Sequence, residues 1–214
     1  WFSRYNRDAL PELPCSLPDG APLSLRAQRE IRTGLEDDPG AAREVQATYY
    51  GMISKVDYLC GKILDTLDRL GLWDDTIVVF LSDHGDYAGQ YGLPEKYDTT
   101  FSDCLMHVPF TIAAPGLPAG RRTDALGDIT SIAPTLCELL GIDPLPGMHG
   151  ESLLGVMSGE REAPGAVFAN GGHEPEMRAR YARPENEPSR PKGKSAVYWR
   201  HPDSMARAQM VRTA

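Results

Sequence analysis

Along residues 41–70 the apolar residues recur at intervals of three and four, which is the period of an α-helix. The pattern ends at Leu70, and Gly71 follows where helices commonly close with a left-handed residue. A single apolar stripe on a helix usually faces a core, so the sequence predicts a core-packing helix. The stripe consists of Val45, Tyr49, Met52, Val56, Leu59, Ile63, Leu67 and Leu70.

A short apolar run, Ile77 to Leu81, follows this helix and is rich in β-branched residues. Its length suits a strand rather than a helix, and a strand that is apolar on both faces is typical of a parallel sheet covered by helices. Val108 to Ala113 reads as a second buried strand. We therefore predict an α/β fold in which helices flank a mostly parallel sheet.

The segments on either side of this α/β region have different patterns. Residues 1–40 are rich in proline and glycine and predict an extended segment with one short helix, at 25–33. Residues 171–194 predict a long polar loop, and 195–199 and 209–213 predict a hairpin that begins a small late antiparallel sheet. The expected divisions are a loop-rich segment (1–40), an α/β region (41–170) and a polar loop with the small sheet (171–214).

Chemistry-bearing residues follow the first predicted strand. In open α/β sheets ligands bind beyond the carboxyl ends of the strands, and Asp83 and His84 stand there. A carboxylate suits Ca²⁺, but two ligands are an incomplete set, so a metal pair and a plain strand-end turn are both open. Asp86 reads either as a partner of His84 or as a turn residue. Lys96 reads either as an anion-binding point charge or as a solvated surface lysine.

Composition narrows the classes of partner. The 22 basic and 30 acidic side chains give a formal net charge of −8, which argues against a general binder of nucleic acid or of anionic membrane surfaces. The longest apolar run is far shorter than a membrane span. The 4 cysteines are scattered, as expected for reduced thiols. No signal-peptide pattern opens the chain, so a cytoplasmic and a periplasmic location both stay open.

An ordered series of sequence blocks resembles the later half of the sulfatases, within the alkaline-phosphatase-like superfamily. The resemblance implies that fold, and it implies hydrolysis of sulfate esters or, in some relatives, of phosphate or phosphonate esters. The blocks are Tyr49-Tyr50-Gly51-Met52-Ile53, Leu70-Gly71-Leu72-Trp73-Asp74-Asp75-Thr76, Ser82-Asp83-His84-Gly85-Asp86, Gly92-Leu93, Lys96, Val108-Pro109-Phe110, Ala133-Pro134-Thr135-Leu136 and Gly150-Glu151-Ser152-Leu153-Leu154.

The resemblance also implies roles for three residues. Asp83 and His84 match the later pair of ligands to a divalent cation, usually Ca²⁺, with Mn²⁺ or Mg²⁺ as alternatives. Lys96 matches the catalytic lysine that binds a sulfate oxygen. In the family the nucleophile is a formylglycine made from a cysteine or serine within C/S-x-P-x-R, and an early Asp-Asp pair completes the metal shell.

The sequence departs from that pattern in three places. No C/S-x-P-x-R motif occurs in the 214 residues, and no pair of adjacent aspartates follows a buried strand. Gln90-Tyr91-Gly92 stands where many relatives carry a histidine. We therefore expect that this polypeptide alone does not turn over a sulfate ester.

Two other interpretations stay open beside a partial sulfatase. One is a phosphodiester or phosphonate monoester hydrolase of the same superfamily, and the other is a non-catalytic structural or interaction module. In each case the predicted strand at 76–81 presents an unpaired edge, so we expect a second copy, a partner chain such as an N-terminal half, or further strands to cover it.

Overall fold

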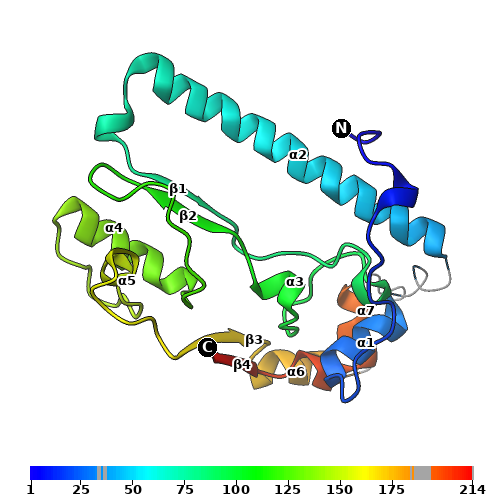
Figure 1. Ribbon diagram of the computed structural model, residues 1–214. Coiled ribbons are helices and arrows are strands. Elements are labelled where there is room, and N and C mark those ends of the chain that lie inside the picture. Colours follow the sequence, from blue (N-terminus) through cyan, green and yellow to red (C-terminus); the bar gives the residue numbers. More distant parts are fainter. Residues whose placement is uncertain (33–34, 36–37, 184, 186–193, 214) are drawn as a thin grey trace. The chain divides into compact units, whose positions relative to one another are not determined.

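The computed structural model describes residues 1–32, 35, 38–183, 185 and 194–213, and Figure 1 shows its elements. The contacts divide the chain into two compact units. The first unit comprises residues 1–66, 84–108 and 170–208, and the second comprises 67–83, 109–169 and 209–214. The two residues of the predicted metal pair therefore belong to different units, because one boundary falls between Asp83 and His84.

Helices dominate the described residues. The α-helices are α1 (Leu23–Ile31), α2 (Pro39–Leu70), α3 (Asp103–Met106), α4 (Ile132–Leu140), α5 (Leu154–Ser158), α6 (Pro175–Tyr181) and α7 (Lys194–Arg200). The strands are β1 (Val78–Leu81), β2 (Phe110–Ala113), β3 (Ala166–Gly171) and β4 (Ala208–Thr213). Single 3₁₀ turns are η1 (Arg7–Ala9), η2 (Trp73–Asp75), η3 (Gln90–Gly92), η4 (Ile129–Ser131) and η6 (Pro202–Met205). None of the helices in these ranges is long and apolar enough for a membrane span.

Helix α2 confirms the helix predicted over residues 41–70, and Gly71 closes it with a φ of 65°. The prediction that its apolar stripe is buried is wrong. Met52 is 58% exposed and Ile63 is 63% exposed, and Val56, Leu59 and Leu70 are exposed as well. Periodicity fixes the helix and the side of it that is apolar, whereas burial also requires an element that packs against that side.

Strands β1 and β2 confirm the two strands predicted at 77–81 and 108–113, but their pairing corrects the predicted sheet. β1 pairs with β2 antiparallel, with Val78 opposite Ala113 and Leu81 opposite Phe110. They form a sheet of two strands rather than a mostly parallel one, and Phe80 is 43% exposed. A two-stranded sheet offers too few neighbours to bury a strand that is apolar on both faces.

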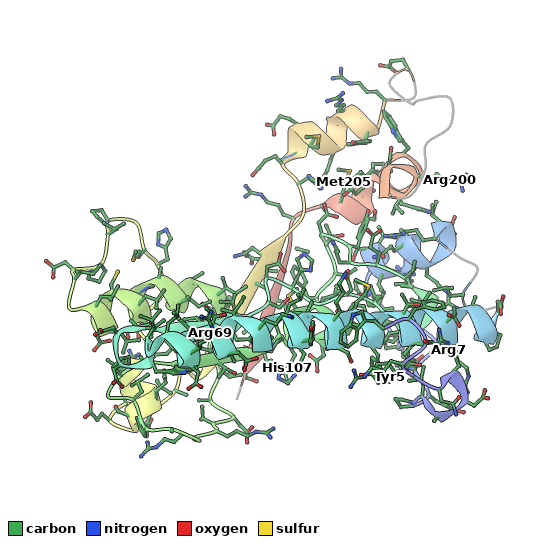
Figure 2. All side chains as sticks on the ribbon, turned by 90° about the horizontal axis from the view of Figure 1, so that it is seen from above. Tyr5, Arg7, Arg69, His107, Arg200 and Met205 are labelled. Atoms are coloured by element: carbon green, nitrogen blue, oxygen red, sulfur yellow. The ribbon has the colours of Figure 1, made fainter. Side chains whose placement is uncertain are left out.

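The N-terminal segment packs against the first half of α2. The Tyr5 hydroxyl lies 2.6 Å from Ser54 Oγ, and Arg7 forms a bidentate ion pair with Glu44, at 2.9 Å from Nε and 2.6 Å from Nη2. Figure 2 shows Tyr5 and Arg7 beside this helix. In α1, Leu25 joins a buried cluster with Tyr87, Leu93 and Leu105, which is the main core of the first unit.

The C-terminal part corrects two further predictions. Residues 194–200 form α7 rather than a strand, so the expected hairpin is absent from the described residues, and β4 pairs with β3 instead. The predicted polar loop at 171–194 contains α6, and residues 184 and 186–193 of it lie outside the described residues. Val197 on α7 is fully buried against Ala27 and Tyr97, and this burial favours a helix over an exposed hairpin.

Candidate functional site

The segment that leaves β1 carries the predicted metal pair. Asp83 is exposed at the end of its unit. His84 is half-buried, and its Nδ1 lies 2.9 Å from the Gly85 carbonyl oxygen. A carbonyl oxygen only accepts, so Nδ1 carries the proton in this contact and the lone pair of the neutral ring is on Nε2. That tautomer is the one in which a histidine ligates a metal through Nε2.

Gly85 fixes the direction in which the chain continues. Its N–H donates to the Leu105 carbonyl oxygen at 2.8 Å. A Cβ on this residue would lie 1.9 Å from the Cys104 carbonyl oxygen, so only glycine lets the main chain approach α3 this closely. The glycine therefore holds the His84 segment against α3.

Asp86 makes the contact that links the strand end to Lys96. Its Oδ1 accepts the main-chain N–H of Lys96 at 2.9 Å, and the bond is partly buried. The sequence offered two interpretations of Asp86, a partner of His84 or a turn residue, and this bond is a third. Sequence reasoning missed it because a carboxylate that reaches an amide ten residues later has no fixed pattern in the sequence.

The loop closed by this bond is packed from within. Tyr87 and Leu93 are fully buried, and Gly89 donates to the Leu93 carbonyl oxygen at 2.9 Å. Tyr91 has a positive φ of 57°, which is rare for a tyrosine. Its N–H donates to Pro14 at 2.5 Å and its carbonyl accepts from Arg29, so the N-terminal segment holds this conformation.

Burial shifts the titration of groups around this loop. The pKa of the Cys104 thiol is raised to about 11, chiefly because burial disfavours the thiolate. The pKa of Tyr49 on α2 is also raised, first by burial and next by the negative charge of Asp86. Both shifts favour the neutral form of the side chain over the anion.

A shallow groove of about 300 Å³ lies between the first half of α2 and this loop, within the first unit. Tyr49 and Met52 line it from α2, and Asp86, Tyr87 and Pro94 line it from the loop. Besides apolar side chains, the lining includes Glu44, Thr48 and Asp86.

Within the first unit, the Asp86 bond joins the segment that begins at His84 to the main chain of Lys96, and Asp83 belongs to the second unit. Across the described ranges, no group of three or more His, Cys, Asp and Glu side chains is placed to hold a metal ion. The donor set of Asp83 and His84 suits a divalent cation in its chemistry, and it amounts to two ligands.

Comparison with known proteins shows which family this sequence belongs to. The sequence model of the sulfatase family matches residues 21–142, which include Asp83, His84, Asp86 and Lys96. The chain is 36% identical over 126 residues to choline-sulfatase of Rhizobium meliloti (strain 1021), covering 57% of this chain and 24% of that protein. It is 33% identical over 165 residues to human (Homo sapiens) arylsulfatase K, covering 74% and 29% respectively.

A solved structure supports the fold. The phosphonate monoester hydrolase SpPMH from Silicibacter pomeroyi matches 99% of this chain and 42% of its own, with a TM-score of 0.68 and 21% identity. The chain spans 20% to 29% of the length of the curated relatives that it matches. On the match of the family model to more than half of its residues, this chain belongs to the sulfatase family, within the alkaline-phosphatase-like fold.

Proposed function

We propose that this chain is the part of a sulfuric ester hydrolase that supplies two ligands to a divalent-cation site and the lysine that binds the sulfate group of the substrate. One observation carries the proposal. Asp83 and His84 follow β1 after one intervening residue, and Asp86, two residues after His84, accepts the main-chain N–H of Lys96. This stretch lies within the residues that match the sulfatase family.

Each residue has a role that suits its chemistry. The Asp83 carboxylate is a hard oxygen ligand of the kind that Ca²⁺ prefers, with Mn²⁺ or Mg²⁺ as alternatives. His84 offers Nε2, because its Nδ1–H is bonded to the Gly85 carbonyl. The cation, when bound, polarises the ester and stabilises negative charge on its oxygens. The Lys96 ammonium binds an anionic oxygen of the ester and offsets charge on the leaving side.

The relatives favour a sulfate ester as the substrate of the whole protein. Choline-sulfatase and arylsulfatase K are two of the relatives, at 36% and 33% identity. The likeness to the phosphonate monoester hydrolase, at 21% identity, bears on the fold alone. A phosphodiester or phosphonate monoester is the second candidate substrate, and a non-catalytic module is the alternative that the missing C/S-x-P-x-R motif favours.

A turnover assay separates a complete enzyme from a partial one. The purified chain is incubated with 4-nitrophenyl sulfate and Ca²⁺, and release of 4-nitrophenol is followed. We expect no turnover above the buffer rate, because the sequence holds no nucleophile motif. Robust, Ca²⁺-dependent release by the chain alone would refute this part of the proposal.

Sulfate binding tests the role of Lys96. Inorganic sulfate is titrated into the ¹⁵N-labelled chain in the presence of Ca²⁺, and the amide shifts of residues 84–96 report binding. Lys96→Ala is expected to weaken binding about 10-fold or more, since it removes the positive charge that faces the anion. Lys55→Ala, on the exposed face of α2, is the matched control and is expected to bind like the wild type. Equal affinities in the two variants would exclude the assigned role and favour the non-catalytic module.

A further inference from the structure

The main chain of Lys96 is held on its N-terminal side by one side chain. Asp86 Oδ1 accepts the Lys96 N–H at 2.9 Å across ten residues of loop, and the contact is partly buried. The bond requires an acceptor oxygen at the Oδ1 position, which the Asp86 side chain supplies. The bond fixes the point from which the lysine side chain extends.

The Asp86 end of this link is itself anchored. The preceding residue, Gly85, donates to the Leu105 carbonyl at 2.8 Å and has no room for a Cβ. On the side of α2, Asp86 lines the same groove as Tyr49. The α3 segment thus holds the residue that precedes Asp86, and with it the start of the link to Lys96.

The chain after Lys96 is anchored just as firmly. Tyr97 and Thr99 are each 2% exposed. The Thr99 hydroxyl donates to the Ser204 carbonyl at 2.8 Å, and the Thr99 carbonyl accepts from the Ser24 hydroxyl at 2.8 Å. The half-buried Lys96 therefore lies between a fixed segment on one side and the Asp86 bond on the other.

From this geometry we infer that Asp86 is a positioning residue, which acts on the sulfate group of the substrate only by fixing the main chain of Lys96. The inference rests on the proposed role of Lys96 and adds to it a residue that the chemistry of sulfate binding does not require. In this role the oxygen of Asp86 matters and its negative charge does not. Asparagine keeps an acceptor oxygen at Oδ1 and loses the charge, whereas alanine loses both.

The experiment compares Asp86→Ala and Asp86→Asn with the wild-type chain in the same titration of inorganic sulfate with Ca²⁺. Asp86→Ala is expected to weaken sulfate binding about 10-fold, because a small displacement of a binding group lowers the affinity steeply. Asp86→Asn is expected to bind as tightly as the wild type. In the same samples, hydrogen exchange of the Lys96 amide is expected to accelerate in Asp86→Ala and to stay slow in Asp86→Asn, with unchanged protection at Leu105.

The outcomes separate this inference from the function on which it rests. If Lys96→Ala weakens sulfate binding and Asp86→Ala does not, the lysine role stands and the positioning role is refuted. If both Asp86 variants bind sulfate more tightly, Asp86 acts through its charge and the inference is wrong. If Lys96→Ala itself binds like the wild type, the proposed function fails first, and the exchange rate of the Lys96 amide still decides whether Asp86 holds it. If the Leu105 amide loses its protection from hydrogen exchange in Asp86→Ala, that variant has disturbed the fold around α3. The sulfate affinity of Asp86→Asn then decides the test, and weaker binding than in the wild type would refute the inference.

Discussion

Two regions of the first unit reverse what their sequence patterns suggest. The middle of α2 has a regular apolar stripe, and yet Met52 and Ile63 are more than half exposed. The loop at 84–108 has no period at all, and yet Tyr87, Leu93 and Leu105 are its buried core. A period reports the local conformation of the backbone, whereas burial depends on which other parts of the chain reach a residue. Hydrogen bonds within the loop hold its apolar side chains together, whereas the apolar side chains in the middle of α2 are exposed.

Truncation of one aliphatic side chain in each region gives the largest difference. Leu105→Ala is expected to lower the free energy of unfolding by about 2–5 kcal/mol, because it leaves a cavity in the core of the loop. Ile63→Ala, on the exposed stripe, is expected to cost less than about 1 kcal/mol, because little apolar surface is lost from the core. Chemical denaturation followed by tryptophan fluorescence measures both. A large loss in Ile63→Ala would mean that another surface covers α2 in solution.

Size-exclusion chromatography with light scattering tests whether another copy of the chain covers the exposed stripe of α2. If a second copy covers the stripe, the wild-type chain elutes as a dimer and Ile63→Gln shifts it toward the monomer. A monomeric wild type with a stable Ile63→Ala variant would confirm an uncovered face.

Glycine substitutions compare the 84–108 loop with α2 through smaller changes in stability. Gly85→Ala is expected to destabilise the chain by about 1–3 kcal/mol, because its Cβ would overlap the Cys104 carbonyl oxygen. Gly61→Ala, in the middle of α2, has nothing within 4 Å of its Cβ and is expected to stabilise the helix by about 0.5–1 kcal/mol. Thermal unfolding monitored by circular dichroism reads both signs. Equal changes in Tm in the two variants would show that Gly85 does not lie as close to α3 as the structure has it.

The smallest effect concerns thiol reactivity and leaves stability unchanged at neutral pH. Burial raises the pKa of Cys104 from 9.0 to about 11, so its thiolate fraction below pH 9 is about 100-fold smaller than for an unshifted thiol. Iodoacetamide is therefore expected to label the exposed Cys15 well before Cys104 at pH 8, as measured by peptide mass spectrometry. The neutral thiol is the form that the fold favours, so its contribution to stability is complete below pH 9 and is lost as the pH rises toward 11. Early labelling of Cys104 would mean that the loop opens readily.

Local rules predicted the elements well where the signal lies within a few neighbouring residues. The period of α2, the Gly71 that closes it with a φ of 65°, and the two apolar runs at β1 and β2 all follow from such signals. The direction of pairing does not, because the antiparallel partner of β1 is chosen by the path of the chain between Leu81 and Phe110. The hairpin expected at 195–199 failed because Val197 packs on α1 and Tyr97, a contact that no local pattern reveals.

For the candidate site, the sequence predicted which residues take part but not the contact that Asp86 makes. The resemblance to sulfatases named Asp83, His84 and Lys96 from motif and order, and the family assignment is confirmed. The roles of these three residues stay predictions. Asp86 escaped prediction because its bond to Lys96 depends on the fold of the whole loop and on the closeness of Gly85 to α3.

Calorimetric titration of the chain with Ca²⁺ tests the central claim most directly. With two of its ligands on this chain, we expect weak saturable binding, on the order of millimolar, as for other sites with few charged ligands. Asp83→Ala and His84→Ala should abolish the binding, while Asp57→Ala, which removes an exposed carboxylate of α2, should leave it unchanged. Binding that survives Asp83→Ala and His84→Ala to the same extent as Asp57→Ala would contradict the assigned pair, and so would the absence of any saturable heat in the wild-type chain.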